Sequence, residues 1–498
     1  MRADANLHFS RRAFLGSLGA GAGMLLAGGL PGAPRWLGGR AYAELDHGAC
    51  LARLDASLSP LQRALTVHPW DEPSRQITNT STIFKRPHID TLFDADQVAL
   101  VRRLYETMLS EQGQAWLENT VTLEGKLGGC VLAIFSDAAP GELAAAAAQG
   151  HAQTMITGGH LMLREGGAAR SGYAFGGPIA YGQQIGNGEF RVRGNAFAAH
   201  GDALNRFYAS LAPGERTVSI VAAVPHELMV QPQGAAGVFE GVSLGSVAPA
   251  ARERARELLD VVLATYKRDA RTDALAAIDG NGGIGALRVA VYADYGFYAD
   301  GSRYNDLTAA DRAKRELPYW QVWRIEGPGC VVHFKGYPHV HAYINIVSDP
   351  TRQNIGEVLT RAAAPLGPAA VRRILTAAMR QETELPLAYY AQDVPARIGA
   401  GDVTVGLVRA IDPFAESIVV ASIRGAEMAD DMREQAAVQG VAVDPGRDYR
   451  VATAAYWSRQ EGVFGRPHRV DPWDRSLHEA LVTYLRDRNL REFHAAIG

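Results

Sequence analysis

The segment Tyr319–Val347 constrains the fold of this chain more than any other part of the sequence. It contains three short runs rich in β-branched and aromatic residues, which are Tyr319–Glu326, Cys330–Phe334 and His339–Val347. Glycine and proline occupy both gaps between the runs. Strand-like runs separated by such turns are typical of an antiparallel meander. We therefore predict an antiparallel sheet within a protein of the α+β class.

Helical and strand-like patterns alternate through the rest of the chain. Apolar residues recur at spacings of three and four in several segments, which predicts amphipathic helices. These predicted helices are Ser59–Gly113, Ala198–Leu211 and Ala248–Lys267. The predicted strands are Thr120–Phe135, Met155–Arg164 and Gly172–Tyr181. Because 498 residues are too many for one hydrophobic core, we expect at least two domains.

Histidines in the last run of the meander suggest a metal site. Residues two apart in a strand point to the same face, so His339 and His341 can present two imidazoles to one ion. His160 can supply a third nitrogen from another strand, and Glu326 and His333 are possible further members. Three nitrogen ligands suit a divalent transition metal such as zinc, copper or iron, and an open fourth position would make the site reactive. The alternative is that these histidines lie on a solvated strand face or only form hydrogen bonds.

Composition excludes several other kinds of site. The three cysteines, Cys50, Cys130 and Cys330, include no close pair, which argues against a disulfide scaffold and a cysteine zinc site. The formal net charge is -3, so there is no broad electrostatic reason to bind nucleic acid or an anionic membrane. We therefore expect no nucleic-acid partner, and a small-molecule ligand is the expected class of partner.

Residues 1–43 have the pattern of an export signal. Ser10–Leu15 matches the twin-arginine motif, a Gly/Ala-rich run follows it, and Ala41-Tyr42-Ala43 supplies a cleavage site. We expect the mature chain to start near Glu44, to leave the cell interior folded through the twin-arginine export machinery, and to be periplasmic or secreted. No membrane partner is then expected after cleavage. The alternative is a chance arginine pair before a membrane anchor, which the many glycines disfavour.

The region 44–350 resembles a family of secreted proteins known only as a domain of unknown function. The resemblance is carried by Gly158-Gly159-His160-Leu161, by Phe175-Gly176-Gly177-Pro178, by Trp320–Pro328 and by His339-Val340-His341 before Asp349-Pro350. The family has a second histidine where this chain has Gly159, and an arginine before its Asp-Pro that is missing here. The resemblance implies one mixed α/β domain over this region.

The region 351–498 resembles the C-terminal domain of the 5′-nucleotidases. The matching segments are Ala400–Thr404, Pro413-Phe414 and Val443–Thr453. The resemblance implies an α/β module with a helix at Ile355–Ala363, a strand at Ser417–Ile423 and a closing helix at Ser476–Arg486.

Most of the ligand residues of that family are replaced in this chain. The position of its phosphate-binding arginine is Pro395, and Arg397, two residues later, could replace it only in part. Tyr456 keeps an aromatic face suited to stacking a base or another flat ring, and Phe464 is a further candidate ligand residue. The family's asparagine is Ala455, and its glycine- and aspartate-rich loop is Gln460–Phe464. These replacements favour a retained fold over a working nucleotide site.

The sequence leaves three functions open. Residues 44–350 lack the metal-binding motifs of a nucleotidase phosphatase domain, so nucleotide hydrolysis by the usual route is not expected. We favour a metal-dependent enzyme, a hydrolase or an oxidoreductase, which uses His160, His339 and His341. The alternative is a non-catalytic periplasmic protein for ligand binding or assembly. A hydrolase of nucleotide catabolism, suggested by the C-terminal resemblance, comes third.

Overall fold

A computed structural model describes residues 42–76, 86–123, 127–184, 195–350, 357–391, 397–412, 416–486 and 488–490. Several sequence predictions fall wholly or partly outside these ranges. They concern the export signal apart from Tyr42 and Ala43, the start of the helix at Ile355, the replacement at Pro395, and the pair Pro413-Phe414. Residues 77–85 of the predicted helical segment Ser59–Gly113 and residues 124–126 of the predicted strand region Thr120–Phe135 also lie outside them.

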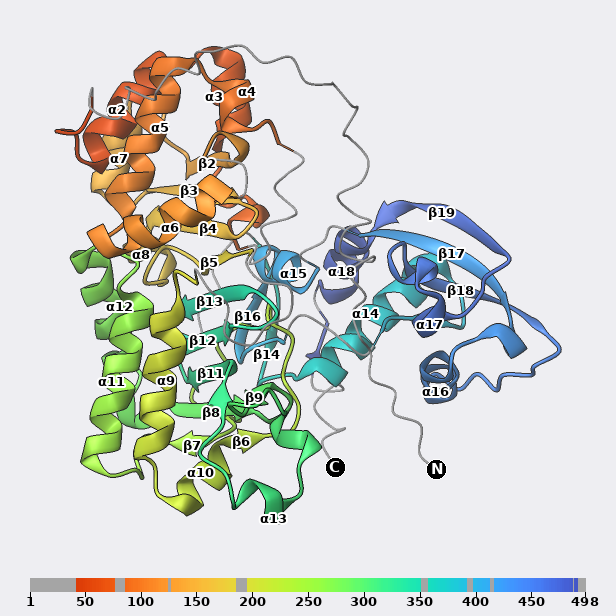
Figure 1. The fold of residues 1–498 in the computed structure, drawn as a ribbon. Coiled ribbons are helices and arrows are strands. Elements are labelled where there is room, and N and C mark those ends of the chain that lie inside the picture. Colours follow the sequence, from red (N-terminus) through yellow and green to blue (C-terminus); the bar gives the residue numbers. More distant parts are fainter. Residues whose placement is uncertain are drawn as a thin grey trace, which may run out of the picture.

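A large mixed sheet organises the chain up to residue 347 (Figure 1). Its strand order is β1-β2-β3-β4-β5-β13-β12-β11-β8-β6, with β7 also pairing with β8. Among the described strands of this sheet, the pairs β1/β2 and β6/β8 are parallel and the others are antiparallel. The strands are β1 (Val67–His68), β2 (Val131–Ser136), β3 (Ala152–Gly158), β4 (Leu161–Gly166), β5 (Ile179–Gln183), β6 (Ile220–Val221), β7 (Val242–Ser243), β8 (Arg288–Tyr292), β11 (Val322–Gly327), β12 (Cys330–Lys335) and β13 (Val340–Ile346). The mixed α and β fold class and the antiparallel meander β11-β12-β13 are confirmed.

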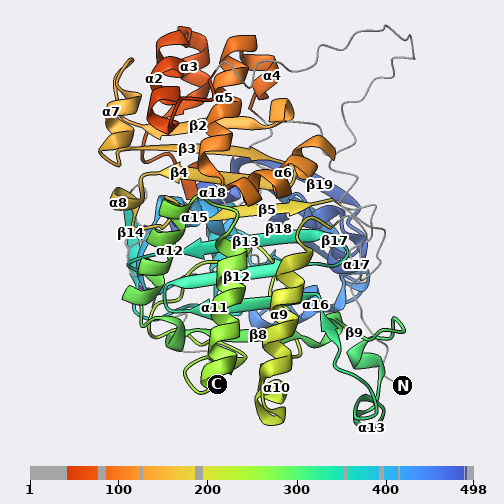
Figure 2. The same cartoon turned by 60° about the vertical axis from the view of Figure 1, so that its left-hand side comes forward.

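One face of this sheet is covered by helices. Helices α9 (Ala198–Ser210), α11 (Pro249–Leu263) and α12 (Arg268–Gly280) lie across it (Figure 2). Their apolar side chains share one core with Trp323, Val332 and Ile344 of the meander. Burial of this apolar surface is the main force that holds the sheet to its helices. Helices α2 (His47–Ser57) and α5 (Ala95–Met108) extend the same core near the β2 end.

The opposite face carries the alternate residues of the same strands, and many of them are ionisable. Arg324, His333 and His341 all belong to this set, because side chains alternate between the two faces of a strand. The irregular segment 226–234 lies over this face, and Leu228 and Val230 pack there against Val331 and Tyr343. We call this side the polar face.

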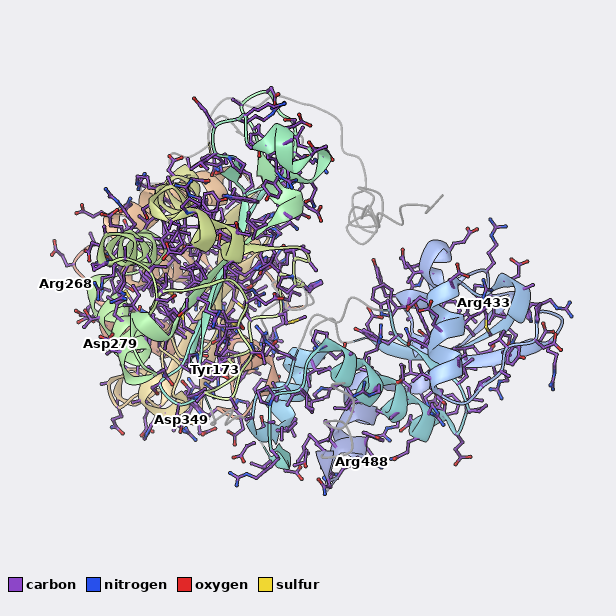
Figure 3. All side chains as sticks on the ribbon, turned by 90° about the horizontal axis from the view of Figure 1, so that it is seen from below. Tyr173, Arg268, Asp279, Asp349, Arg433 and Arg488 are labelled. Atoms are coloured by element: carbon purple, nitrogen blue, oxygen red, sulfur yellow. The ribbon has the colours of Figure 1, made fainter. Side chains whose placement is uncertain are left out.

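The residues from 357 onward have their own core beside the polar face (Figure 3). Helix α14 (Pro368–Thr383) packs against α18 (Leu477–Leu485) and against a four-stranded sheet of order β15-β18-β17-β19. These strands are β15 (Ala388–Tyr389), β17 (Ser417–Arg424), β18 (Asp448–Ala454) and β19 (Arg469–Ser476). Helix α15 (Val405–Ile411) contacts the short helix η2 (Pro73–Gln76) of the first region.

Several predicted elements differ from those observed. The predicted helical segment Ser59–Gly113 includes the strand β1, and the predicted strand Gly172–Tyr181 enters the sheet as β5 only from Ile179. The prediction of a helix at Ile355–Ala363 is wrong over its described part, because β14 (Val358–Ala362) is a strand that pairs with β16 (Gly401–Thr404). The β-branched residues Val358 and Thr360 suit a strand, and pairing with β16 satisfies their backbone groups. The predicted strand region Thr120–Phe135 begins as the end of helix α6 (Glu111–Leu123), and its described strand is β2.

Two further observations concern the cysteines and the membrane. All three cysteines are buried, and none of them forms a disulfide bond. In the described ranges, every helix is too short or too polar to cross a lipid bilayer.

Candidate metal centre

The structure brings His160, His339 and His341 together at one edge of the polar face. One nitrogen from each ring can be chosen so that all three lie within 4.8 Å of one another. The ring centroids of His160 and His341 are 4.8 Å apart, and those of His339 and His341 are 4.5 Å apart. His341 lies in β13 and His339 directly precedes it, while His160 lies in the turn between β3 and β4.

Strand pairing explains how His160 reaches a pair of histidines almost 180 positions away in sequence. Strand β5 lies between β4 and β13, with Tyr181 opposite Leu161 and Gly182 opposite His341. Continuing this register places His160 opposite Gly182. A Cβ atom at Gly182 would lie 2.0 Å from the Val340 carbonyl oxygen. The glycine therefore allows β5 and β13 to approach, and no side chain separates the two imidazoles.

The half-buried carboxylate of Glu227 orients His341. The Nδ1 atom of His341 is 3.0 Å from Oε2 of Glu227, and the ammonium group of Lys335 donates to the same oxygen at 3.0 Å. With Nδ1–H donating to the carboxylate, the Nε2 lone pair of His341 faces the other two rings. A carboxylate behind a histidine is a common outer partner of a metal ligand, because it fixes the tautomer and the ring orientation.

The environment of His339 and His341 favours their neutral imidazole form. Burial, together with the neighbouring His341 and His160, lowers the pKa of His339 to about 3. Burial also lowers the pKa of His341, although Glu227 partly opposes this. Burial alone would raise the pKa of Glu227, but His341 and Lys335 outweigh it and hold that pKa well below its usual range. Neutral imidazole is the form that binds a metal ion.

The distances between the rings fit a shared ion. The Nε2 atoms of His339 and His341 are 3.0 Å apart. Two nitrogens bound to one zinc ion at about 2.0–2.1 Å lie roughly 3.3 Å apart in tetrahedral geometry. The side chain of His341 is 13 % exposed, so the cluster is neither sealed in the core nor spread on the surface. The donor set could therefore hold a transition metal and leave one position for water or substrate.

Sequence reasoning missed Glu227. It lies in an irregular segment far from all three histidines in sequence, and it forms no spacing motif with them. The adjacent pair His226-Glu227 was the only local signal, and a His-Glu pair alone is too common to indicate a site.

The other two suggested members lie elsewhere on the polar face. His333 is buried, and Arg324 approaches it with Nε 3.4 Å from Nδ1. Burial, together with the Arg324 charge, lowers the pKa of His333 well below its usual value. Glu326 forms an ion pair with Arg397 of the C-terminal region. Neither residue contributes a ligand atom to the three-histidine cluster.

The predicted ligand residues of the C-terminal region are found in packing roles. Arg397 is buried against the polar face, where it bonds to Glu326 and to the backbone oxygen of Gln231. Phe464 is fully buried, with its ring 5.6 Å from that of Tyr389. Tyr456 is half-buried, edge-on to Trp457 at 4.8 Å. Binding of a ligand by these three residues stays a prediction.

The fold and the cluster define a mixed α/β protein with a histidine-rich centre on one face of its main sheet. No protein-family model matches the chain, and no curated protein matches it. Two solved structures show a limited likeness. One is a 5′-nucleotidase precursor from Thermus thermophilus, at 14% identity and a TM-score of 0.23, covering 35% of this chain and 48% of that one.

The second solved structure is a putative 5′-nucleotidase from Staphylococcus aureus in complex with alpha-ketoglutarate. It is 12% identical, with a TM-score of 0.21, and the match covers 36% of this chain and 50% of that one. This chain thus matches about half the length of either structure. A likeness of this extent leaves the function to be argued from the site itself.

Proposed function

We propose that this protein is a metal-dependent hydrolase whose ion is held by His160, His339 and His341. The observation that carries the proposal is the convergence of three imidazoles beside Glu227, a carboxylate that fixes the direction of one of them. Three features support a binding site over a chance cluster. Glu227 orients the His341 ring, the pKa of His339 is low, and Gly182 has no side chain that would separate the imidazoles.

The proposed chemistry uses the open position of such a centre. An ion held by His160, His339 and His341 would supply Lewis-acid activation of water at neutral pH. Within the chain, Glu227 holds the His341 ring, and Lys335 keeps that carboxylate charged. His339 and His160 complete the ligand set from two different turns. Hydrolysis requires no electron donor, which makes it the simplest reaction for this donor set.

Metal analysis of the purified full-length protein tests the first part of the proposal. We expect about one equivalent of zinc or another transition metal per chain, and at least tenfold less in a His339→Ala/His341→Ala variant. His151, an exposed histidine outside the cluster, provides the matched control, and His151→Ala should retain the metal. Equal metal content in all three proteins would exclude the site.

Activity assays test the second part. The metal-loaded protein should hydrolyse at least one member of a panel of carboxylic esters, phosphate esters and amides, and removal of the metal should abolish that activity. AMP belongs in the panel because of the C-terminal resemblance. If the protein instead binds copper or iron tightly, shows redox activity and hydrolyses no member of the panel, the hydrolase proposal is wrong and the protein is an oxidoreductase.

Export through the twin-arginine machinery is part of the proposal for where the protein acts. Its support is the segment Ser10–Leu15 followed by Ala41-Tyr42-Ala43. Replacement of both Arg11 and Arg12 by lysine should retain the protein inside the cell with its signal uncleaved. Unchanged export of that variant would contradict this route.

A further inference from the structure

Arg324 of β11 is a buried guanidinium with unused hydrogen-bond donors. The residue is 3 % exposed. Its Nε lies 3.4 Å from Nδ1 of His333, and its Nη1 is 3.7 Å from Oε2 of Glu326, which is too long for a hydrogen bond. Within the described part of the chain, Nη1 and Nη2 have no hydrogen-bond partner. The two terminal nitrogens of the guanidinium, which we call the Arg324 fork, therefore lack hydrogen-bond acceptors among the described residues.

Within the described ranges, the buried carboxylate near Arg324 is that of Glu326, and it is already engaged. Oε1 of Glu326 accepts from Nη2 of Arg397 and from Nε2 of Gln233, the latter at 3.1 Å. Two buried guanidiniums, Arg324 and Arg397, thus share a single carboxylate. Glu240 also acts on Arg397, but it is exposed to solvent. The buried part of this cluster carries one positive charge in excess.

A buried charge without a partner is expensive. An arginine side chain stays protonated in proteins, so Arg324 cannot reduce the cost by losing its proton. The penalty for an uncompensated buried ion is several kcal/mol. Native proteins avoid this cost by pairing the charge, and a guanidinium fork pairs best with two oxygens of one planar group.

We propose that the Arg324 fork binds a small monocarboxylate at the boundary between the polar face and the C-terminal region. Two carboxylate oxygens match the two free nitrogens, and a single negative charge balances the single excess positive charge. A phosphate dianion would reverse the imbalance in a buried place. Gln231, which contacts Arg397, also has a buried Nε2 without a partner in the described ranges and is a second possible donor.

This site is separate from the metal centre. Arg324 connects to Glu326 and, through it, to Arg397, whereas His341 connects to Glu227 and Lys335. Arg324 is opposite His333, which is opposite Tyr343, and His341 lies two residues from Tyr343 along β13. At ordinary strand spacings this offset is roughly 12 Å between the Cα atoms of Arg324 and His341. Occupancy of the fork would strengthen the attachment of the C-terminal region to the sheet.

The test uses the full chain in chloride buffer at pH 7.5 and constant ionic strength. Sodium acetate, sodium formate and inorganic phosphate are titrated separately while the melting temperature is measured, and ¹⁴C-acetate binding is measured by equilibrium dialysis. We expect acetate and formate to raise the melting temperature saturably, with one acetate bound per chain. Arg324→Met should lose this response, and Arg324→Lys, which keeps the charge without the fork, should bind acetate at least tenfold more weakly.

Two controls separate this site from other effects. Arg256→Met alters an exposed arginine on α11 and should respond like the wild type. His339→Ala should also respond like the wild type, which excludes acetate bound to a metal ion. The proposal fails if wild-type protein binds no acetate saturably, if Arg324→Met responds unchanged, or if phosphate stabilises the protein more than acetate at equal concentration. Should Arg324→Met fail to fold, dialysis with the wild type and Arg324→Lys decides the question.

Discussion

The two faces of β11, β12 and β13 have opposite chemistry although they come from alternating residues of the same strands. Trp323, Val332 and Ile344 face the helices and lie in the main core. Arg324, His333 and His341 face the other way, toward segment 226–234 and the C-terminal region. The comparison teaches that stability and chemistry can be assigned to alternate positions of one strand, and it predicts that mutations on the two faces will have different consequences.

The largest effect is expected on the apolar face. Trp323 is fully buried, with its ring stacked 5.1 Å from Phe334. Trp323→Ala should lower the free energy of unfolding by about 3–5 kcal/mol, measured by urea denaturation, because it leaves a cavity. Metal content per folded molecule should not change. A loss of metal without a loss of stability would break the assignment of this face to the core.

A histidine on the apolar face should behave as a pH-dependent stability element. His200 of α9 stacks on Phe334, and burial lowers its pKa to about 3, although a hydrogen bond involving the Phe197 backbone partly opposes this. The unfolded state takes up a proton near pH 6.5, before the folded state does, so stability is present above pH 6.5 and is lost as pH falls toward 3.

The measurement for His200 is the free energy of unfolding between pH 7 and pH 4. One proton contributes a slope of up to about 1.4 kcal/mol per pH unit. His200→Gln can still bond to the Tyr181 hydroxyl, and it should show a shallower pH dependence than the wild type. Identical pH curves for the two proteins would show that His200 does not carry this dependence.

An intermediate effect is expected at Gly182, where the backbones of β5 and β13 approach closely. Gly182→Ala would place a methyl group against the Val340 carbonyl, which cannot move without moving β13. We expect a loss of about 1–3 kcal/mol in unfolding free energy and reduced metal content. Gly214, whose Cβ position is open, provides the control, and Gly214→Ala should have neither effect. Normal metal content in Gly182→Ala would remove the role given to the glycine.

The smallest effect on stability, and a selective effect on metal binding, is expected at Glu227. Glu227→Gln should weaken metal affinity by about 10–100-fold, because His341 loses the carboxylate that fixes its tautomer. Competition with a chelator measures this affinity, and urea denaturation of the metal-free protein checks that the fold is retained. Glu240, an exposed glutamate on the same side of the sheet, supplies the control Glu240→Gln. Equal affinities for both variants would leave Glu227 without a positioning role.

Local patterns were sufficient to predict the meander and one half of the candidate site. The Gly/Pro turns indicated the strands β11, β12 and β13, and the spacing of two indicated a shared direction for His339 and His341. Both signals depend only on neighbours in sequence, for which backbone geometry is nearly fixed.

Non-local partners could not be predicted in the same way. The position of His160 depends on the pairing of β4, β5 and β13, and that of Glu227 depends on the path of an irregular segment. The pairing of Arg397 with Glu326 required the C-terminal region to dock on the polar face. The helix predicted near Ala363 failed for the same reason, because β14 exists only through its partner β16. Tertiary pairing outweighs local preference in such cases.

The separation of the three histidines along the chain has a consequence for the order of events in assembly. An unfolded chain offers only His339 and His341 as close neighbours, and two flexible imidazoles make a weak site. The third imidazole arrives only when β4, β5 and β13 have paired. Tight metal binding would therefore indicate that folding is complete. If the chain is exported already folded, as proposed, it would acquire its ion in the cytoplasm, before export.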